Sequence, residues 1–473
     1  MTADGWVGVD VGTSSLKAVL VSVDEDRGFA RVERTVSRAY AADGSPTRDP
    51  AAWASHAAAA LHEVVRGARP LGVGFTGQMH ALIPLESGDR VAAPVRLWLD
   101  TEGEPALARF VRRHPFDWVA RTGNIPLPDF TLAKWLCARE RTAGLKERVR
   151  RLLLPKDFVR TRVAPGSTVC TDPTDAAGTQ VYDPFAGRWD MDIAAAAGIP
   201  PEALVDVLPS DAVVGEMRLG ECAGVKVVVG AGDQAAAARA VGAVVPGVAS
   251  LSLGTSGVLL APLGRADLPP GWSGDLHLFP GVAGSGPQVI ATIPALGPGL
   301  SWAARLLGAT TEELEAWAGA GVGGPCFFPY LGGSGAPHAD TERRGLLTGL
   351  GLDTDRAAVA RAVYEGYALE FGALLDELRA AGVAVREVVL SGGVAELAVF
   401  ARTVASALGT PVYRVHASSA SAAGAALLAR DAVRGGGRPV LERSFVNGAK
   451  PPLRRETWNR LRARVLAEAT PGR

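Results

Sequence analysis

The chain has 473 residues, of which 48% are apolar and 21% are charged, a composition typical of a folded protein with several domains. Lys plus Arg and Asp plus Glu both number 49, so the formal net charge is zero. This composition excludes a disordered, collagen-like or coiled-coil chain. The balanced charge offers no basic field for nucleic acid or for an anionic membrane.

Cysteine usage and the first residues bear on the compartment. The four cysteines lie far apart and form no CxxC pair, which suits a reducing cytoplasm better than a disulfide framework. The first ten residues, MTADGWVGVD, have no basic leader and do not predict a signal peptide. Uncharged stretches at about 240–264 and 276–304 are interrupted by Pro and Gly, which indicates strands and turns instead of membrane spans. We expect a cytoplasmic protein with no nucleic-acid or membrane partner.

The first half of the chain mixes the patterns of strands and helices. Apolar, β-branched runs at 6–10 and 16–22 flank the small residues GTSS, which predicts a hairpin with a tight turn. The pattern therefore indicates an α/β fold. Further along, helices are predicted at about 50–66 and 130–150, and strands at 70–76 and 81–86.

The second half repeats part of this order. A strand at 225–229 runs through GAGD into an alanine-rich helix, and a second Gly-Thr-Ser turn then lies between two apolar runs. A long amphipathic helix at 356–382 precedes another strand, an SGG turn and a helix. The order predicts a duplicated architecture, with two unrelated hairpins as the simpler alternative.

A boundary between the halves is expected near 240–248, where Gly and Pro interrupt the pattern. The expected domains are 1–243 and 244–431. Residues 432–473 are interpreted as a linker and a terminal helix without assignable chemistry.

The two Gly-Thr-Ser turns are candidate phosphate sites, because small residues let an anion approach backbone NH groups closely. The first turn contains Thr13 and Ser14, with Lys17 two residues beyond it, and the second contains Gly254 and Thr255. Two such turns predict a polyphosphate in a cleft between the halves. No Walker loop occurs in the sequence, which excludes an ordinary P-loop nucleotide site.

Asp10 lies immediately before the first turn, at the end of a predicted strand. A carboxylate beside phosphates is unfavourable unless a divalent cation lies between them, which suggests Mg²⁺ at Asp10, bound through water. Mg²⁺ keeps much of its own hydration and needs few protein oxygens. The alternative is a strand-end carboxylate that faces solvent.

The segment GAGDQA places Asp233 and Gln234 at the start of a predicted helix. The helix dipole and free NH groups are expected to keep Asp233 ionised, which suits a base that orients a hydroxyl. The same order also matches a dinucleotide-binding fingerprint, but Asp233 would face the pyrophosphate and no acid follows within about 20 residues to hold a ribose. A plain helix N-cap is the other alternative.

The segment GQMHA places Gln78, Met79 and His80 between two predicted strands. An amide, a thioether and an imidazole side by side suit a polyol, which needs paired donors and acceptors on an apolar surface, although a single His is more often structural. Trp98 either supplies that surface or fills the core.

Gly392 and Gly393 form the SGG turn after a predicted strand. They let a flat ring or a phosphate lie against the backbone, or else make a simple tight turn.

With these segments placed, the sequence resembles the FGGY carbohydrate kinases, and within them the xylulokinases, from about residue 6 to 430. The matching segments follow the family's order and spacing. They are GVDVGTSSLKAVL, GFTGQMHALIPLESGDRVAAPVRLWLD, NIPLPDFTLAKW, LLLPKDFVRTRV, TDPTDAAGT, GAGDQAAAA, SLGTSGV, FFPYLGGSGAPH, RAVYEGYALEF, VLSGGVAEL and GAALLA.

This resemblance implies an actin, hexokinase and Hsp70 type of fold, which is ribonuclease H-like: two duplicated α/β domains around a central cleft for MgATP and a sugar. It implies that Asp233 is the base that takes a proton from the sugar hydroxyl and that Asp10 is the acid near the metal. The implied sugar contacts are Gln78, Met79, His80, Asp233 and Gln234, and the implied ATP contacts are Thr13, Ser14, Lys17, Gly254, Thr255, Gly392 and Gly393.

Several positions depart from the xylulokinase pattern. Leu99 and Glu102 stand where an Asn and an Arg are usual, and Gly335 stands where an Arg precedes the Pro-His pair. Ser419 replaces a Glu near GAALLA, and Gln234 replaces an Asn that other FGGY kinases also lack. The two missing guanidinium groups bear on which sugar is bound and on efficiency more than on the reaction class.

We expect ATP-dependent phosphorylation of a ketopentose, D-xylulose to D-xylulose 5-phosphate, by in-line transfer of the γ-phosphoryl group. The alternatives are a kinase for ribulose, a heptulose or a polyol, a sensor of the same fold that has lost turnover, and a nicotinamide-dependent oxidoreductase. The presence of Asp10 and Asp233 favours an enzyme over a sensor. The expected partners are the sugar and MgATP, with a homodimer as one hypothesis for the assembly.

Overall fold

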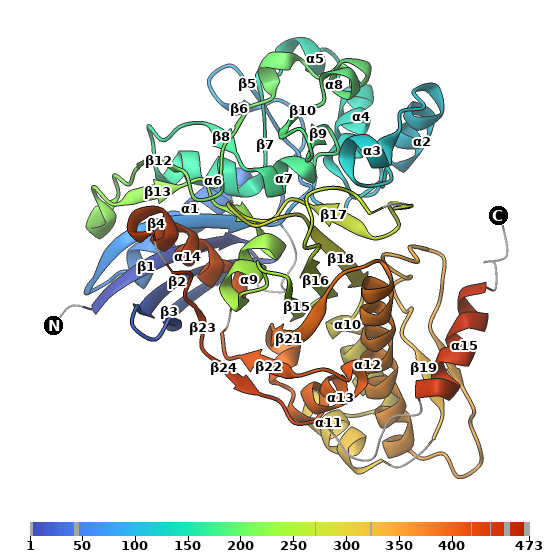
Figure 1. The fold of residues 1–473 in the computed structure, drawn as a ribbon. Coiled ribbons are helices and arrows are strands. Elements are labelled where there is room, and N and C mark those ends of the chain that lie inside the picture. The colour runs from blue at the N-terminus through green and yellow to red at the C-terminus, as the bar shows by residue number, and fades with distance from the viewer. Residues whose placement is uncertain are drawn as a thin grey trace.

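Two large β-sheets organise the chain, one mainly from the first half and one from the second (Figure 1). The computed structural model describes residues 3–41, 47–269, 271–321, 324–417, 419–435, 437–448 and 455–467. The first sheet runs in the order β12 (Val213–Glu216), β13 (Lys226–Val228), β4 (Ala68–Gly77), β1 (Ala3–Val11), β2 (Ser15–Asp24), β3 (Phe29–Ala39) and β23 (Val440–Leu441), and β14 (Ala231–Gly232) pairs with β4. The second runs in the order β17 (His277–Phe279), β18 (Gln288–Ile293), β16 (Gly257–Pro262), β15 (Gly247–Leu253), β21 (Val385–Ser391), β22 (Val412–Val415) and β24 (Arg443–Phe445).

The first sheet begins with the predicted hairpin. β1 and β2 pair antiparallel around the GTSS turn, and the apolar residues Val7, Val9 and Val11 of β1 are fully buried. A parallel neighbour needs a crossover, which α1 (Pro50–Val64) supplies before β4 pairs parallel with β1. The side chain of Asp49 accepts a hydrogen bond from the NH of Ala51 and caps this helix.

The second sheet repeats this arrangement. β15 and β16 pair antiparallel around the second Gly-Thr-Ser turn, and α12 (Arg356–Ala380) precedes β21, which pairs parallel with β15. The strand orders β4-β1-β2 and β21-β15-β16 are therefore equivalent. This equivalence confirms the predicted duplication.

Two helices, α9 (Asp233–Val241) and α14 (Ala420–Arg434), lie between the sheets (Figure 1). α14 contacts β1, β2 and β4, whereas α9 contacts α14 and β15. A Cβ at Gly8 or Gly74 would lie within 1.9 Å of a backbone oxygen of α14, and a Cβ at Gly424 would lie 1.8 Å from the backbone oxygen of Ala236. Only glycine permits this approach, which brings the start of α14 against the end of β1.

The predicted helix at 130–150 is wrong as a single element. The chain forms α4 (Thr131–Arg141) and α5 (Leu145–Arg148), separated by Gly144 in a left-handed conformation with φ of 67°. Such a residue cannot continue a right-handed helix.

The remaining helices lie around the two sheets and beside α4. Within the described residues, none of the helices is long and apolar enough to cross a membrane. The other helices are α2 (Glu104–Arg113), α3 (Trp118–Thr122), α6 (Pro155–Val163), α7 (Pro173–Ala177), α8 (Met191–Ala197), α10 (Gly297–Leu307), α11 (Thr311–Ala320), α13 (Ala398–Leu408) and α15 (Arg455–Ala467). The shorter strands are β5 (Ile83–Glu86), β6 (Arg90–Val91), β7 (Arg151–Leu153), β8 (Cys170–Thr171), β9 (Tyr182–Asp183), β10 (Arg188–Trp189), β11 (Asp206–Val207), β19 (Cys326–Phe328) and β20 (Leu346–Thr348).

The tail beyond residue 431 is more than the predicted linker. β23 pairs with β3 of the first sheet, and β24 pairs with β22 of the second. The edges of both sheets thus satisfy the backbone hydrogen bonds of this segment, which its Gly and Pro content did not indicate. The predicted terminal helix is present as α15, and its Trp458 is buried and donates a hydrogen bond to the carbonyl of Phe327.

We expect Gly424→Ala to destabilise the protein, although alanine usually favours a helix. The added Cβ would lie 1.8 Å from the carbonyl oxygen of Ala236, so α9 and α14 must separate. Overpacking of this kind costs about 1–3 kcal/mol, measured by urea unfolding. Gly437→Ala is the control, because its Cβ would meet nothing within 4 Å. Equal stability of the two variants would contradict the proposed close approach.

Candidate active site

Three parallel strands of the first sheet end side by side. In the strand register Val11 of β1 lies opposite Gly77 of β4, and Gly77 lies opposite Gly232 of β14. The residues at or just beyond these ends include Asp10, Gln78 and Asp233. Carboxyl ends of parallel strands are the usual place for a ligand site in α/β sheets, so the register itself assembles this edge.

Two hydroxyl groups from α14 hold the carboxylate of Asp10. Ser421 Oγ donates a hydrogen bond of 2.6 Å to Asp10 Oδ2, and Ser419 Oγ donates one of 3.3 Å to the same atom. Asp10 Oδ1 is buried and has no hydrogen-bond partner among the described residues. Burial raises the pKa of Asp10, while Ser421 and the charge of Lys17 across the hairpin oppose that rise. One carboxylate oxygen is thus fixed, and the other has no partner in the described part of the chain.

Asp233 is the first residue of α9. The residue before it, Gly232, occupies the N-cap position, so the plain N-cap alternative for Asp233 is wrong. Its Oδ1 accepts a hydrogen bond of 2.8 Å from the backbone NH of Gln234. Burial, and then the nearby charge of Asp10, raise the pKa of Asp233 to about 7. The expectation that the helix dipole and free NH groups keep Asp233 ionised is not met at neutral pH, because burial and the charge of Asp10 oppose them.

A short series of hydrogen bonds joins the first Gly-Thr-Ser turn to the predicted sugar segment. Thr13 Oγ1 donates to Gln78 Oε1 at 3.3 Å, and Gln78 Nε2 donates to the carbonyl of Gly12 at 3.3 Å. Trp98 Nε1 donates to Thr13 Oγ1 at 2.9 Å, and its indole remains 37% exposed. Trp98 therefore belongs to this surface and not to the core, whereas Ser14 in the same turn faces outward.

His80 follows Gln78 by two residues and has a left-handed backbone conformation, with φ of 64°. Its Nδ1 is 3.0 Å from the carbonyl oxygen of Gly178, and its ring meets that of Phe130 edge to face at 4.7 Å. Burial lowers the pKa of His80 to about 4, so the imidazole is neutral. Because a carbonyl can only accept, the proton lies on Nδ1 and Nε2 is an acceptor.

Met79 is buried beside Asp233. A Cβ added at Gly232 would lie 2.8 Å from Met79 Cγ and 2.9 Å from its Sδ. The thioether therefore packs under the turn that carries Asp233. This contact brings the predicted sugar segment against the turn that carries Asp233.

The other predicted nucleotide contacts lie at the equivalent edge of the second sheet. Ser252 of β15 lies opposite Ser391 of β21, so Gly254 and Thr255 on one side and Gly392 and Gly393 on the other follow neighbouring strand ends. Gly392 has φ of 91°, and a Cβ there would lie 2.4 Å from the carbonyl oxygen of Leu253. The chain thus places these residues together, but on a different sheet from Asp10.

Three of the departures from the expected pattern, at Glu102, Gly335 and Ser419, have local structural reasons. Glu102 forms ion pairs with Arg96, at 3.2 Å, and with Arg141, so its charge is paired. At Gly335 a Cβ would lie 2.2 Å from Thr292 Oγ1, so this backbone leaves no room for an arginine side chain. Ser419 contacts Asp10, as described above. Leu99 is partly exposed, and nothing in the structure explains its presence.

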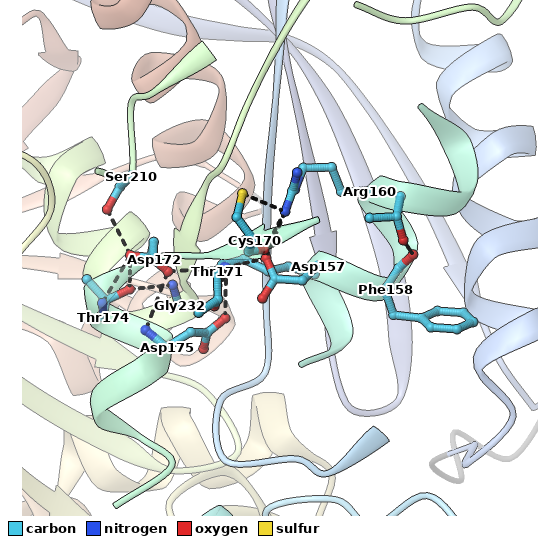
Figure 2. Close-up of polar contacts among 12 residues, drawn as sticks. Asp157, Phe158, Arg160, Cys170, Thr171, Asp172, Thr174, Asp175, Ser210 and Gly232 are labelled. Atoms are coloured by element: carbon cyan, nitrogen blue, oxygen red, sulfur yellow. Dashed lines mark hydrogen bonds and ion pairs between the residues drawn. The ribbon is translucent and has the colours of Figure 1, made fainter. Parts of the chain in front are cut away.

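A buried ionic cluster, which the sequence pattern did not indicate, lies beside this edge (Figure 2). Lys156 Nζ lies 2.7 Å from Asp157 and 3.2 Å from both Asp172 and Asp175, and all four side chains are buried. Arg160 adds a second buried cation 3.4 Å from Asp157. The segments LLLPKDFVRTRV and TDPTDAAGT contain these residues, but charged residues are usually exposed, so their pairing could not be read from the sequence.

Comparison with known proteins identifies the family. The model of the N-terminal domain of the FGGY family of carbohydrate kinases matches residues 5–240, and the model of its C-terminal domain matches residues 249–432. The chain belongs to the FGGY family of carbohydrate kinases. Its fold is accordingly the two-domain, actin and hexokinase-like architecture, and its substrates are a sugar or related polyol and ATP.

Individual relatives of this FGGY kinase span nearly the whole chain. A xylulose kinase of Streptomyces coelicolor is 31% identical and covers 98% of this chain and 96% of its own length. A glycerol kinase of Thermus brockianus is 31% identical over 88% of each chain. The crystal structure of a xylulose kinase from Brucella ovis has a TM-score of 0.85 at 29% identity and covers 98% of both chains.

We expect Asp233→Asn to raise the melting temperature at about pH 8. With its pKa near 7 the folded state disfavours the charged carboxylate, which the unfolded chain accepts above about pH 4. This cost is complete above pH 7 and fades as the folded group takes up its proton toward pH 4. The difference in melting temperature should therefore shrink with falling pH. Asp267→Asn, at an exposed position, is the control, and a difference independent of pH would contradict the burial of Asp233.

Proposed function

We propose that this FGGY kinase transfers the γ-phosphoryl group of ATP to the terminal hydroxyl of D-xylulose, giving D-xylulose 5-phosphate. The observation that carries the proposal is the partly buried carboxylate of Asp233, with a pKa near 7, beside Asp10 and the sugar segment. A base whose pKa lies near neutrality can both hold and release a proton at working pH. The xylulose kinases among the relatives support the choice of sugar.

In this proposal the sugar lies on Gln78, Met79 and His80. The amide of Gln78 and the acceptor Nε2 of His80 orient hydroxyl groups, and Met79 supplies apolar contact. Asp233, with Gln234 beside it, accepts the proton of the attacking hydroxyl as the bond to phosphorus forms. Because phosphoryl transfer requires mainly alignment and charge stabilisation, positioning of these groups contributes most of the acceleration.

The phosphates of ATP are proposed to lie between the two glycine-rich edges. Thr13, Ser14 and Lys17 would contact them from the first sheet. From the second sheet, Gly254 and Thr255 would bind phosphate through backbone NH groups, while Gly392 and Gly393 would let the nucleoside lie against the chain.

Asp10 is the proposed contact of Mg²⁺, through water. Its buried Oδ1 lacks a hydrogen-bond partner, which suits a cation or its hydration shell. In the described part of the chain no group of three or more His, Cys, Asp or Glu side chains is placed to hold a metal, and Mg²⁺ needs only a few protein oxygens when phosphates and water complete its shell. When bound, Mg²⁺ neutralises phosphate charge.

A kinase for a related acceptor is the second candidate. The glycerol kinase of Thermus brockianus has the same 31% identity as the xylulose kinase of Streptomyces coelicolor, although over a smaller share of the chain. Glu102 and Gly335 also remove arginines that xylulokinases usually carry. Both observations concern the acceptor and leave the transfer chemistry unchanged.

Three further expectations remain predictions: the domain division at residues 243 and 431, a homodimer, and a cytoplasmic location. Light scattering of the purified chain measures whether it is a homodimer, and cell fractionation measures whether it is cytoplasmic.

A coupled ADP assay with D-xylulose, D-ribulose, a heptulose and glycerol tests the acceptor. We expect the highest kcat/KM with D-xylulose.

Asp233→Asn should lower kcat by about 10²–10⁴-fold, the range for loss of a positioned base, and should leave ATP binding by calorimetry unchanged. Inert D-xylulose beside an active relative would overturn the acceptor, and normal turnover by Asp233→Asn would remove that residue from the mechanism.

Ser421→Ala tests the support of Asp10. Loss of the 2.6 Å hydrogen bond frees the carboxylate to rotate, so we expect a several-fold rise in the Mg²⁺ concentration that gives half-maximal rate, with a smaller change in the KM for sugar. Ser301→Ala is the control, because that exposed hydroxyl bonds only within its own helix. Unchanged Mg²⁺ dependence in Ser421→Ala would contradict this role.

A further inference from the structure

The hydroxyl of Thr174 links the buried ionic cluster to the turn that carries Asp233. Thr174 Oγ1 accepts a hydrogen bond of 2.8 Å from the backbone NH of Gly232, the residue immediately before Asp233. The same hydroxyl donates a hydrogen bond of 2.7 Å to Asp172 Oδ2. Figure 2 shows the hydroxyl of Thr174 in contact with both Gly232 and Asp172. Both side chains, Thr174 and Asp172, are fully buried, so water does not compete for these bonds.

Asp172 is held from several directions and cannot easily turn. Its Oδ2 also accepts a hydrogen bond of 2.8 Å from Ser210 Oγ, and its carboxylate caps α7 by accepting from the backbone NH groups of Thr174 and Asp175. Its Oδ1 lies 3.2 Å from Lys156 Nζ. A carboxylate with this many charge-assisted contacts is a rigid anchor for the hydroxyl that it accepts from.

The ionic cluster makes this anchor costly to disturb. Lys156 is shared among Asp157, Asp172 and Asp175, and Arg160 compensates Asp157 from the other side. Burial alone would lower the pKa of Lys156, but the three aspartates raise it above its ordinary value, so this residue is a cation. Movement of Lys156 away from this cluster would leave buried carboxylates uncompensated, which is strongly unfavourable.

The other end of α7 reaches the sugar segment. The carbonyl of Gly178, directly after α7, accepts the hydrogen bond of His80 Nδ1, and a Cβ at Gly178 would lie 2.9 Å from that nitrogen. The segment 174–178 therefore contacts the turn before Asp233 through Thr174 and the imidazole of His80 through Gly178, the residue that follows α7.

We propose that Thr174 is a positioning residue for phosphoryl transfer. Its hydroxyl fixes the Gly232 peptide, and thereby the carboxylate of Asp233, relative to His80. The inference rests on the proposed function of Asp233 as the base. It goes further by identifying which buried groups hold that base in place.

Thr174→Val tests the proposal, because valine has the shape of threonine without the hydroxyl. We expect kcat to fall about 10–100-fold, since a displacement of about 1 Å can cost about 10²-fold in rate, while the KM for ATP stays within about twofold. Thr174→Ser restores the hydroxyl and should recover most of the lost kcat.

Ser210→Ala is the matched control. It removes a hydrogen bond of similar length to the same oxygen of Asp172 but leaves the Gly232 peptide in contact with Thr174. We expect its kcat within about threefold of the original, even where its melting temperature falls as far as that of Thr174→Val. If Thr174→Val does not fold, Thr174→Ala removes the same hydroxyl without placing a methyl group where the hydroxyl was.

Two results would overturn the proposal. One is an equal loss of kcat in Thr174→Val and Ser210→Ala, which would mean that the cluster supports stability alone. The other is a Thr174→Val enzyme with lower stability and unchanged kcat. Asp233→Asn, assayed beside them, separates this failure from a failure of the proposed function, because normal turnover by that variant would reject Asp233 as the base, whatever Thr174 does.

Discussion

The close approach of α14 to the first sheet and to α9 is the constraint on which the site depends. At Gly8, Gly74 and Gly424 the backbones meet so closely that a Cβ would lie within 1.9 Å of a backbone oxygen. Because no side chains separate them, the first turn of α14 reaches the end of β1, and the hydroxyls of Ser419 and Ser421 contact Asp10. A helix from the second half of the chain thus completes a site that begins at residue 10.

The electrostatic design differs between the site and the layer below it. At the edge of the sheet, Asp10 and Asp233 lie close enough for the charge of one to raise the pKa of the other, and no buried cation pairs with Asp233 in the described structure. Beneath them, Lys156 and Arg160 pair with buried aspartates, and burial raises the pKa of one of these, Asp175, well above its usual range. The upper groups are left to interact with ligands, and the lower ones hold the scaffold rigid.

The departures from the xylulokinase pattern are compatible with this design. Glu102 is neutralised by two arginines, and the backbone at Gly335 packs directly on Thr292, so neither position leaves an unpaired charge or a void. Ser419 replaces a Glu, and its hydroxyl, unlike a carboxylate, can donate to Asp10. A second carboxylate at that place would add repulsion between like charges.

The sequence by itself determined the strands, the glycine turns, the duplication and the segments that contain the site, because these follow from local patterns of apolar and small residues. It failed where the decisive neighbours are distant in the chain. Ser421 is 411 residues from Asp10, Gly232 is 58 residues from Thr174, and the pairing of β23 and β24 joins both sheets to the tail. The raised pKa of Asp233 and the buried charge of Lys156 were likewise decided only by the tertiary structure. Burial and Coulombic interaction depend on distance in space, which no local pattern encodes.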